Sequence, residues 1–259
     1  MPLPRVLEVE VMDTAAEAAD YNAMDHSAVN AAFAQDLLTA LASGGRGSPE
    51  TQPPDTSPSF PSGCRPKYQG ALSPENSAPR SPLEILDLGT GTALIPIEIC
   101  RRSSHCRITA VDLAAHMIAL AKTNVAAAGM SDCIILQQID AKALPFADGQ
   151  FDVVISNSII HHIPEPMHSL REAVRVTKPG GLLFFRDLLR PDSETTLQQL
   201  VQTYAGSENA HSRQMFDDSL HAALSLDEIR ALVTDLGFPA DSVHQTTDRH
   251  WTWTGKRVL

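Results

Sequence analysis

The stretch 83–99 constrains the fold most, because it predicts a buried strand, a glycine turn and a helix in direct succession. The run 85–88 is apolar apart from Asp87, as expected of a strand that is covered on both faces. Gly89 and Gly91 follow at once, and glycine allows positive φ and a close approach of a ligand to the backbone. The free N–H groups of the next helix, expected to start near residue 92, point to the same place. The stretch therefore predicts a nucleotide-like ligand at the carboxyl end of a parallel strand.

Strand and helix patterns alternate through the rest of the core and predict an α/β fold with a doubly wound, mostly parallel sheet. The last part of the chain is mostly helical and ends in two short strands that predict an antiparallel hairpin. The further expected strands are 107–111, 134–138, 151–156 and 182–186, with the hairpin at 242–247 and 250–254. The expected helices are 114–128, 167–176, 192–205, 212–224 and one that a capping box at 225–228 begins.

The chain divides into three parts by composition. Residues 1–42 predict a helical N-terminal cap, with a short helix capped by Asp13 or Thr14 and a second helix over 27–42. Residues 43–82 are rich in proline, serine and glycine without periodicity, and we expect a disordered or low-complexity insertion there. Residues 83–259 form the predicted core domain.

Composition excludes several classes of protein. The 259 residues carry a formal net charge of −11, whereas a general nucleic-acid binder needs clustered basic residues. There is no run of 18 apolar residues and no signal-peptide pattern at the start, so we expect a soluble cytoplasmic protein that does not enter a membrane. The four cysteines form no C-x-x-C pair, which favours reduced, structural cysteines over a shared metal site.

Three acidic residues, Asp87, Asp112 and Asp140, stand at the ends of successive predicted strands. Right-handed crossovers place these strand ends along one edge of the sheet, so the carboxylates are expected to line one crevice. Asp112 follows Gly91 by about 20 residues, the distance at which a carboxylate reaches ribose hydroxyls. Leu94 replaces the third glycine of a dinucleotide fingerprint, which disfavours a pyrophosphate. A ligand with ribose, adenine and a charged amino-acid end fits better.

Seven segments follow one another in an order and spacing that one family shares: 85–92, 110–113, 140–141, 144–146, 151–154, 156–163 and 178–181. Through them the chain resembles the class I S-adenosylmethionine-dependent methyltransferases of the small-molecule type. The resemblance covers about 105 residues, from 83 to 187, and one departure is Ala93, where many members have a glycine. It implies a Rossmann-like sheet and S-adenosylmethionine as the cofactor.

The resemblance also implies roles for individual residues. The glycine turn would pass under the methionine part of the cofactor, Asp112 would bind the ribose hydroxyls, and Asp140 would accept from the adenine amino group. The cap segment around Tyr21 and His26 resembles the helical cap of some small-molecule methyltransferases, and the alternative is that these two residues only anchor the cap. The implied cofactor-binding residues are Asp87, Gly89, Thr90, Gly91, Asp112, Leu113, Met117, Asp140, Ala141, Asn157 and Tyr21.

Candidates on the acceptor side follow the fourth and fifth predicted strands. His161 or His162 could act as a general base for an oxygen or nitrogen acceptor, and the alternative is that their rings pack locally. Asp187 is a further candidate that could equally cap a loop. His168 completes no convincing metal triad with the other two, so we expect no metal site. Two tryptophans, at 251 and 253, share one strand face, which favours packing in the sheet core or against the cap over substrate stacking.

The first interpretation is therefore an enzyme that transfers a methyl group to a small-molecule acceptor. Two alternatives stay open: a non-catalytic Rossmann-like binding protein and a nicotinamide-dependent oxidoreductase. Leu94 and the segment 157–162 speak against the oxidoreductase. The sequence leaves the acceptor and the oligomeric state undetermined.

Overall fold

The computed structural model describes residues 3–11, 13–44 and 81–258, which include a seven-stranded sheet in the order β3-β2-β1-β4-β5-β7-β6. The first five strands in this order run parallel, β7 is antiparallel to β5, and β6 is antiparallel to β7. The predicted mostly parallel sheet with an antiparallel hairpin is confirmed. The strands are β1 (Leu83–Leu88), β2 (Cys106–Asp112), β3 (Ile134–Gln138), β4 (Phe151–Asn157), β5 (Thr177–Leu188), β6 (Val243–Gln245) and β7 (His250–Lys256).

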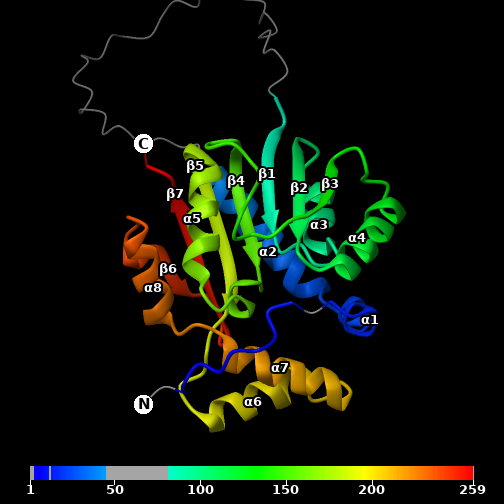
Figure 1. Ribbon diagram of the computed structural model, residues 1–259, viewed down its shortest axis with the longest axis vertical. Coiled ribbons are helices and arrows are strands. Elements are labelled where there is room, and N and C mark those ends of the chain that lie inside the picture. Colours follow the sequence, from blue (N-terminus) through cyan, green and yellow to red (C-terminus); the bar gives the residue numbers. More distant parts are fainter. Residues whose placement is uncertain (1–2, 12, 45–80, 259) are drawn as a thin grey trace, which may run out of the picture.

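Helices cover both faces of this sheet (Figure 1). One apolar core joins α2, α3 and α4 to the sheet, and a second core joins α5 and α8 to its other face. Phe33 and Leu37 of α2 are fully buried in the first core, so this helix of the predicted cap packs directly on the sheet. The α-helices are α1 (Ala15–Ala23), α2 (Ser27–Gly44), α3 (Leu94–Arg102), α4 (Ala115–Ala127), α5 (Pro166–Val176), α6 (Glu194–Ala205), α7 (Ala210–Ala222) and α8 (Leu226–Asp235).

The helix starts follow capping signals where the sequence has them. Thr14 caps α1 and Ser225 caps α8, each in a capping box with a glutamate three residues later. The helix expected near residue 92 begins instead at Leu94, because Ala93 adopts the left-handed conformation with φ of 62°. The predicted insertion 43–82 lies almost entirely outside the described residues.

Strand β5 is much longer than the predicted strand 182–186. It begins at Thr177, which pairs with Phe151 of β4, and the register of the pair then shifts before Val153 meets Leu182. The segment 178–181, which the sequence predicts only as the end of a helix, therefore lies within β5 at this irregularity. The far half of β5 pairs along its whole length with β7, which extends it to Leu188.

The N-terminal segment 3–11 lies against α7 and the end of β4, as Figure 1 shows below the sheet. The Arg5 guanidinium donates hydrogen bonds to the carbonyl oxygens of Ala222, His161 and Ile163. The backbone N–H of Val6 donates to the carbonyl of His221 at 3.1 Å. These bonds fix the segment beside the 3-10 helix η1 (Ile160–His162), where it becomes part of the candidate site.

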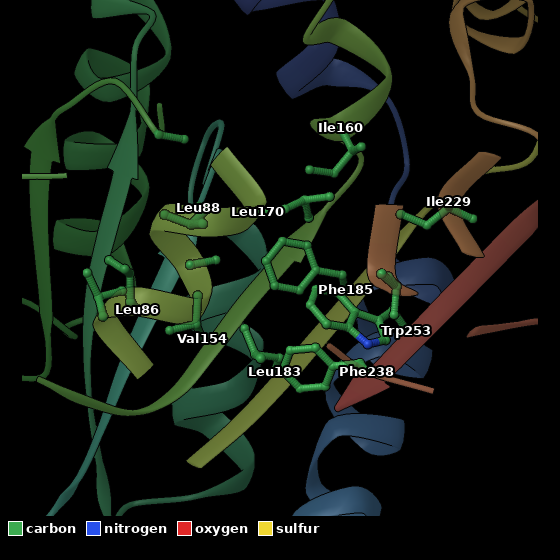
Figure 2. Packing of buried hydrophobic residues seen from close by; sticks show 14 of the residues in the cluster. Leu86, Leu88, Val154, Ile160, Leu170, Leu183, Phe185, Ile229, Phe238 and Trp253 are labelled. Carbon is green, nitrogen blue, oxygen red and sulfur yellow. The ribbon is translucent and has the colours of Figure 1, made fainter. Parts of the chain in front are cut away.

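Trp251 and Trp253 lie fully buried in the core between β5, β7 and α8, so the prediction of sheet core is confirmed. Figure 2 shows Trp253 against Phe185 and Phe238, with ring centroids 5.3 Å and 5.1 Å from that of Trp253. Neither indole N–H has a hydrogen-bond partner among the described residues. Both side chains therefore act through apolar packing.

Candidate active site

A pocket opens at the carboxyl ends of β1, β2 and β4, where the sequence placed its acidic residues. The chain segment before α1 and the side chain of Tyr21 from α1 lie across it. Its walls combine backbone of the glycine turn, carboxylates and apolar side chains. The lining residues include Glu10, Val11, Tyr21, Gly89, Gly91, Asp112, Leu113, Ala114, Met117, Asp140, Ala141, Lys142, Asn157, Ser158, Ile159, His162 and Ile163.

The glycine turn forms the floor of this pocket. Gly89 has a φ of 69°, and a Cβ added there would lie only 2.5 Å from Ile159 Cδ1. The ring of Tyr21 stands over the next glycine, since a Cβ at Gly91 would be 3.6 Å from Tyr21 Cε1. Thr90 between them is buried and its N–H donates to the Val111 carbonyl at 2.9 Å, which ties the turn to β2.

Asp112 is anchored by backbone and keeps acceptor capacity for a ligand. Its Oδ2 accepts a hydrogen bond from the Gly91 N–H at 2.7 Å, and its Oδ1 accepts from the Ala114 N–H at 2.9 Å. Burial raises the pKa of this carboxyl, while the N–H donors of Ala114 and Gly91 oppose that rise. Because each carboxylate oxygen has two lone pairs, two acceptor positions remain for hydroxyl donors.

Asp87 lies deeper, at the end of β1, and is almost completely buried. Burial raises the pKa of its carboxyl from the ordinary 3.8 to about 7, and the Asp112 carboxylate acts in the same direction. The two acids also surround Tyr21, whose pKa is raised to about 12 by burial and by both carboxylates. This arrangement favours a ligand with a positively charged group near Asp87, since a cation stabilises the ionised carboxylate.

The raised pKa of Asp87 predicts a pH-dependent loss of stability in the ligand-free protein. Between pH 4 and pH 7 the folded state holds a proton that the unfolded state has lost, so stability falls as pH rises through this window. Asp87→Asn removes this loss. We therefore expect the melting temperature of Asp87→Asn minus that of wild type to be larger at pH 8 than at pH 5, by at least about 2–4 °C. An equal difference at both pH values would contradict the assignment.

The outer wall of the pocket combines an apolar surface with a paired acid. Leu113 is 37% exposed beside buried Met117, which leaves an apolar surface for a planar ring. Asp140 Oδ1 accepts from the backbone N–H of Lys142 at 2.8 Å, and the Lys142 ammonium lies 3.3 Å from the same oxygen. Lys142 also pairs with Glu10, which ties the N-terminal segment to this wall. Ala141 is buried beside Asp140.

Asn157 and Ser158 form the polar end of β4 at the inner wall. The Oδ1 atom of Asn157 is buried and has no hydrogen-bond partner among the described residues. Ser158 has a φ of 58°, and the only other described non-glycine residue with positive φ is Ala93 beside the glycine turn. Backbone strain of this kind concentrates at functional sites, and both positions adjoin this pocket or its turn.

The two predicted catalytic histidines occupy different environments. His162 lines the pocket, whereas His161 is buried behind it and is not one of the lining residues. His161 Nδ1 lies 2.5 Å from Asp187 Oδ1, and this carboxylate raises the pKa of His161 although burial alone would lower it. Burial and the neighbouring His161 lower the pKa of His162 to about 3, so His162 is neutral near pH 7.

Sequence reasoning missed three charged residues at the site: Glu8, Glu10 and Lys142. Glu8 Oε1 lies 3.1 Å from His162 Nδ1, and Glu10 and Lys142 line the pocket. The segment 3–11 is short and has no periodicity, so nothing in the sequence placed its acids here. His26, named as a cap residue, packs against Tyr21 with ring centroids 4.7 Å apart and therefore supports the Tyr21 ring from outside the pocket.

A known family and two known proteins that this chain resembles in sequence are methyltransferases. A family model described as "Methyltransferase domain" matches residues 86–185. The chain is 30% identical over 172 residues to the ubiquinone/menaquinone biosynthesis C-methyltransferase UbiE of Roseobacter denitrificans, covering 62% of this chain and 68% of that protein. It is 29% identical over 177 residues to the 27-O-demethylrifamycin SV methyltransferase of Amycolatopsis mediterranei, covering 67% of this chain and 61% of that protein.

Solved structures agree on the fold. A SAM dependent methyltransferase from Aquifex aeolicus matches with a TM-score of 0.52 at 17% identity, over 68% of this chain and 82% of that chain. A putative S-adenosyl-L-methionine-dependent methyltransferase from Methanococcus maripaludis also gives 0.52 at 17% identity, over 70% and 80%. Within the described part of the chain, no helix has the length and apolar character needed to cross a membrane.

Proposed function

We propose that this chain, which belongs to the class I S-adenosylmethionine-dependent methyltransferases and uses S-adenosylmethionine as its cofactor, methylates a small molecule bound in the pocket described above. The observation that supports this most is the hydrogen bond from the Gly91 N–H to the Asp112 carboxylate. It places a carboxylate that can accept hydrogen bonds from ribose hydroxyls next to the glycine turn, within one pocket. Membership of this family disfavours both alternatives that the sequence left open, the non-catalytic Rossmann-like binding protein and the nicotinamide-dependent oxidoreductase. A cytoplasmic location stays a prediction.

The residues present fit the parts of this cofactor. In our proposal Asp112 accepts from the ribose hydroxyls, Leu113 and Met117 hold the adenine, and Asp140 with Ala141 meets its edge. The methionine part would lie over Gly89, Thr90 and Gly91, with its ammonium toward Asp87. Asn157, whose buried Oδ1 has no hydrogen-bond partner in the described part of the chain, would lie with Tyr21 at the methionine end of the cofactor.

The cofactor supplies an electrophilic methyl group on a sulfonium, so the protein mainly has to place the acceptor atom in line with it. Polar and apolar groups meet on the acceptor side of the pocket, at Ser158, Ile159 and Ile163. One relative is named a C-methyltransferase and another is named for 27-O-demethylrifamycin SV, so the family accommodates both carbon and oxygen acceptors. We therefore leave the acceptor atom open.

For an acceptor that must lose a proton, we propose that the pair His161 and His162 serves the acceptor side. His162 is the one that lines the pocket, and its low pKa keeps it neutral and able to accept a proton. A base this weak suits an acidic acceptor hydroxyl or enol better than an alcohol. His161, bonded to Asp187 and outside the pocket, would act as a positioning residue.

Calorimetric titration with S-adenosylmethionine tests the site, with NAD as the competing ligand. Asp112→Ala should weaken S-adenosylmethionine binding by about 1.5–3 kcal/mol, because it removes charge-assisted hydrogen bonds to the ribose. Asp132→Ala, at an exposed carboxylate outside the pocket, is the matched control and should bind normally. Unchanged affinity in Asp112→Ala, with a melting temperature showing that the variant is folded, would reject the ribose assignment.

A further inference from the structure

Three potential metal ligands converge where the N-terminal segment meets η1. Glu8, His161 and His162 each offer one ligand atom, and these atoms all lie within 4.8 Å of one another. Glu8 Oε1 is 3.1 Å from His162 Nδ1 and 3.6 Å from His161 Nε2. Ligands at 2.0–2.1 Å from a tetrahedral zinc ion are separated by about 3.3 Å, so two of the three separations already bracket that value.

We propose that Glu8, His161 and His162 form a binding site for a divalent transition-metal ion such as Zn²⁺. Two imidazoles and one carboxylate are a donor set that suits zinc, cobalt, nickel or ferrous iron, whereas magnesium and calcium prefer oxygen ligands alone. Three protein ligands leave at least one coordination position open for water or another ligand. The proposal replaces the expectation of no metal site.

The other polar atoms of two ligands are held by neighbours in the way that metal ligands require. His161 bonds Asp187 through Nδ1 at 2.5 Å, which leaves Nε2 to face Glu8. Glu8 accepts a hydrogen bond from the Ser219 hydroxyl on Oε2 at 3.2 Å, which leaves Oε1 to face the histidines. Outer partners of this kind fix the orientation of a ligand and raise its basicity.

The cluster has unmet polar requirements without an ion. Glu8 Oε1 and His162 Nδ1 are buried and neither has a hydrogen-bond partner with acceptable geometry among the described residues. The rings of the two histidines lie against each other with centroids 4.1 Å apart and a tilt of 35°, and each ring turns one nitrogen toward Glu8. A cation between these atoms satisfies both of them, whereas leaving them unpaired is costly in the interior.

Charge and access also favour a cation. The carboxylates of Glu8, Asp187 and Asp218 act on this cluster, and Arg5 is the opposing positive charge. A surface hollow lined by Glu8, Asp217, Asp218 and the neighbouring residues of the segment 6–9 lies against the cluster on one side. On the other side His162 lines the pocket of the proposed acceptor, so the ion would lie at the border of that pocket.

An ion would take the Nδ1 lone pair of His162. Metal binding and a role of that atom as a base are therefore alternatives, and a metal titration decides between them without any acceptor. The proposal does not depend on the proposed methyl acceptor, and its failure would leave the methyltransferase assignment untouched. The third ligand comes from a segment far away in sequence, which explains why the spacing of the histidines alone gave no metal signal.

The test is calorimetric titration of the untagged, chelator-treated full chain with zinc salt alone, with magnesium salt as the hard-cation control. Wild type should bind one zinc ion and no magnesium. Glu8→Gln keeps the shape of the ligand but loses its charge, so its dissociation constant should rise by at least about 100-fold, since loss of an outer partner alone costs about 10–100-fold. His168→Gln changes an exposed histidine in the same region and should bind as wild type does.

Two further measurements keep the result decisive. The melting temperature of metal-free Glu8→Gln checks folding, and His162→Gln serves as the second ligand variant if Glu8→Gln does not fold. Cobalt substitution should give the visible bands of a low-coordinate site with nitrogen ligands in wild type, and these should disappear in either variant. Absence of stoichiometric zinc binding in wild type, or equal binding in wild type and in a folded ligand variant, would overturn the proposal.

Discussion

Gly89→Ala is expected to lower the free energy of unfolding by about 2–6 kcal/mol and to remove measurable S-adenosylmethionine binding. Two effects add in this variant. An alanine at φ of 69° is strained by about 1–3 kcal/mol. Its Cβ would also lie 2.5–2.9 Å from three atoms of Ile159, one of them Cβ, and overpacking of this kind costs about 1–3 kcal/mol. Ile159 lines the pocket, so its displacement changes the ligand site itself.

Gly129→Ala separates these two effects. Gly129 has the same φ of 69° and follows α4 outside the pocket, and no atom of the described residues lies within 4 Å of a Cβ added there. It should therefore show the strain alone and bind S-adenosylmethionine with wild-type affinity. Denaturant unfolding and calorimetry of the two variants give both quantities. Equal destabilisation of the two, with normal binding in Gly89→Ala, would contradict the close contact between the glycine turn and Ile159.

Local signals made most of the fold predictable. The glycine turn, the alternation of buried strands with amphipathic helices and the capping residue Ser225 each depend on a few adjacent residues, and the structure contains them all. Long-range pairing was less accessible. The length of β5 depends on the pairing of Thr177 with Phe151 and on the pairing with β7. Neither pairing can be predicted from the residues of β5 alone.

The site also contains parts that local sequence predicts and parts that depend on long-range contacts. Asp112 and the glycine turn belong to one continuous pattern, so sequence spacing brought them together before any geometry was known. Glu8 reaches the histidines only because Arg5 and Val6 bond to the backbone near η1 and α7. Such docking depends on contacts between distant segments, which explains why the acceptor side of the pocket was the least predictable part.

Trp253→Ala is expected to destabilise the protein by about 3–5 kcal/mol, because it opens a cavity in a core that cannot fully collapse. The indole lies between Phe185 on β5 and Phe238 after α8, so its loss also weakens the attachment of β7 to the parallel strands (Figure 2).

Trp253→Phe is the matched comparison. It keeps an aromatic ring there and removes an indole N–H that has no partner among the described residues. The unmet N–H is itself unfavourable, so this variant should lose less than about 1.5 kcal/mol. Denaturant unfolding with equal m-values measures both losses, and calorimetry should show unchanged S-adenosylmethionine affinity in Trp253→Phe. If Trp253→Ala lost less than about 1 kcal/mol, the tryptophan would not be the packing element that joins the C-terminal hairpin to the sheet.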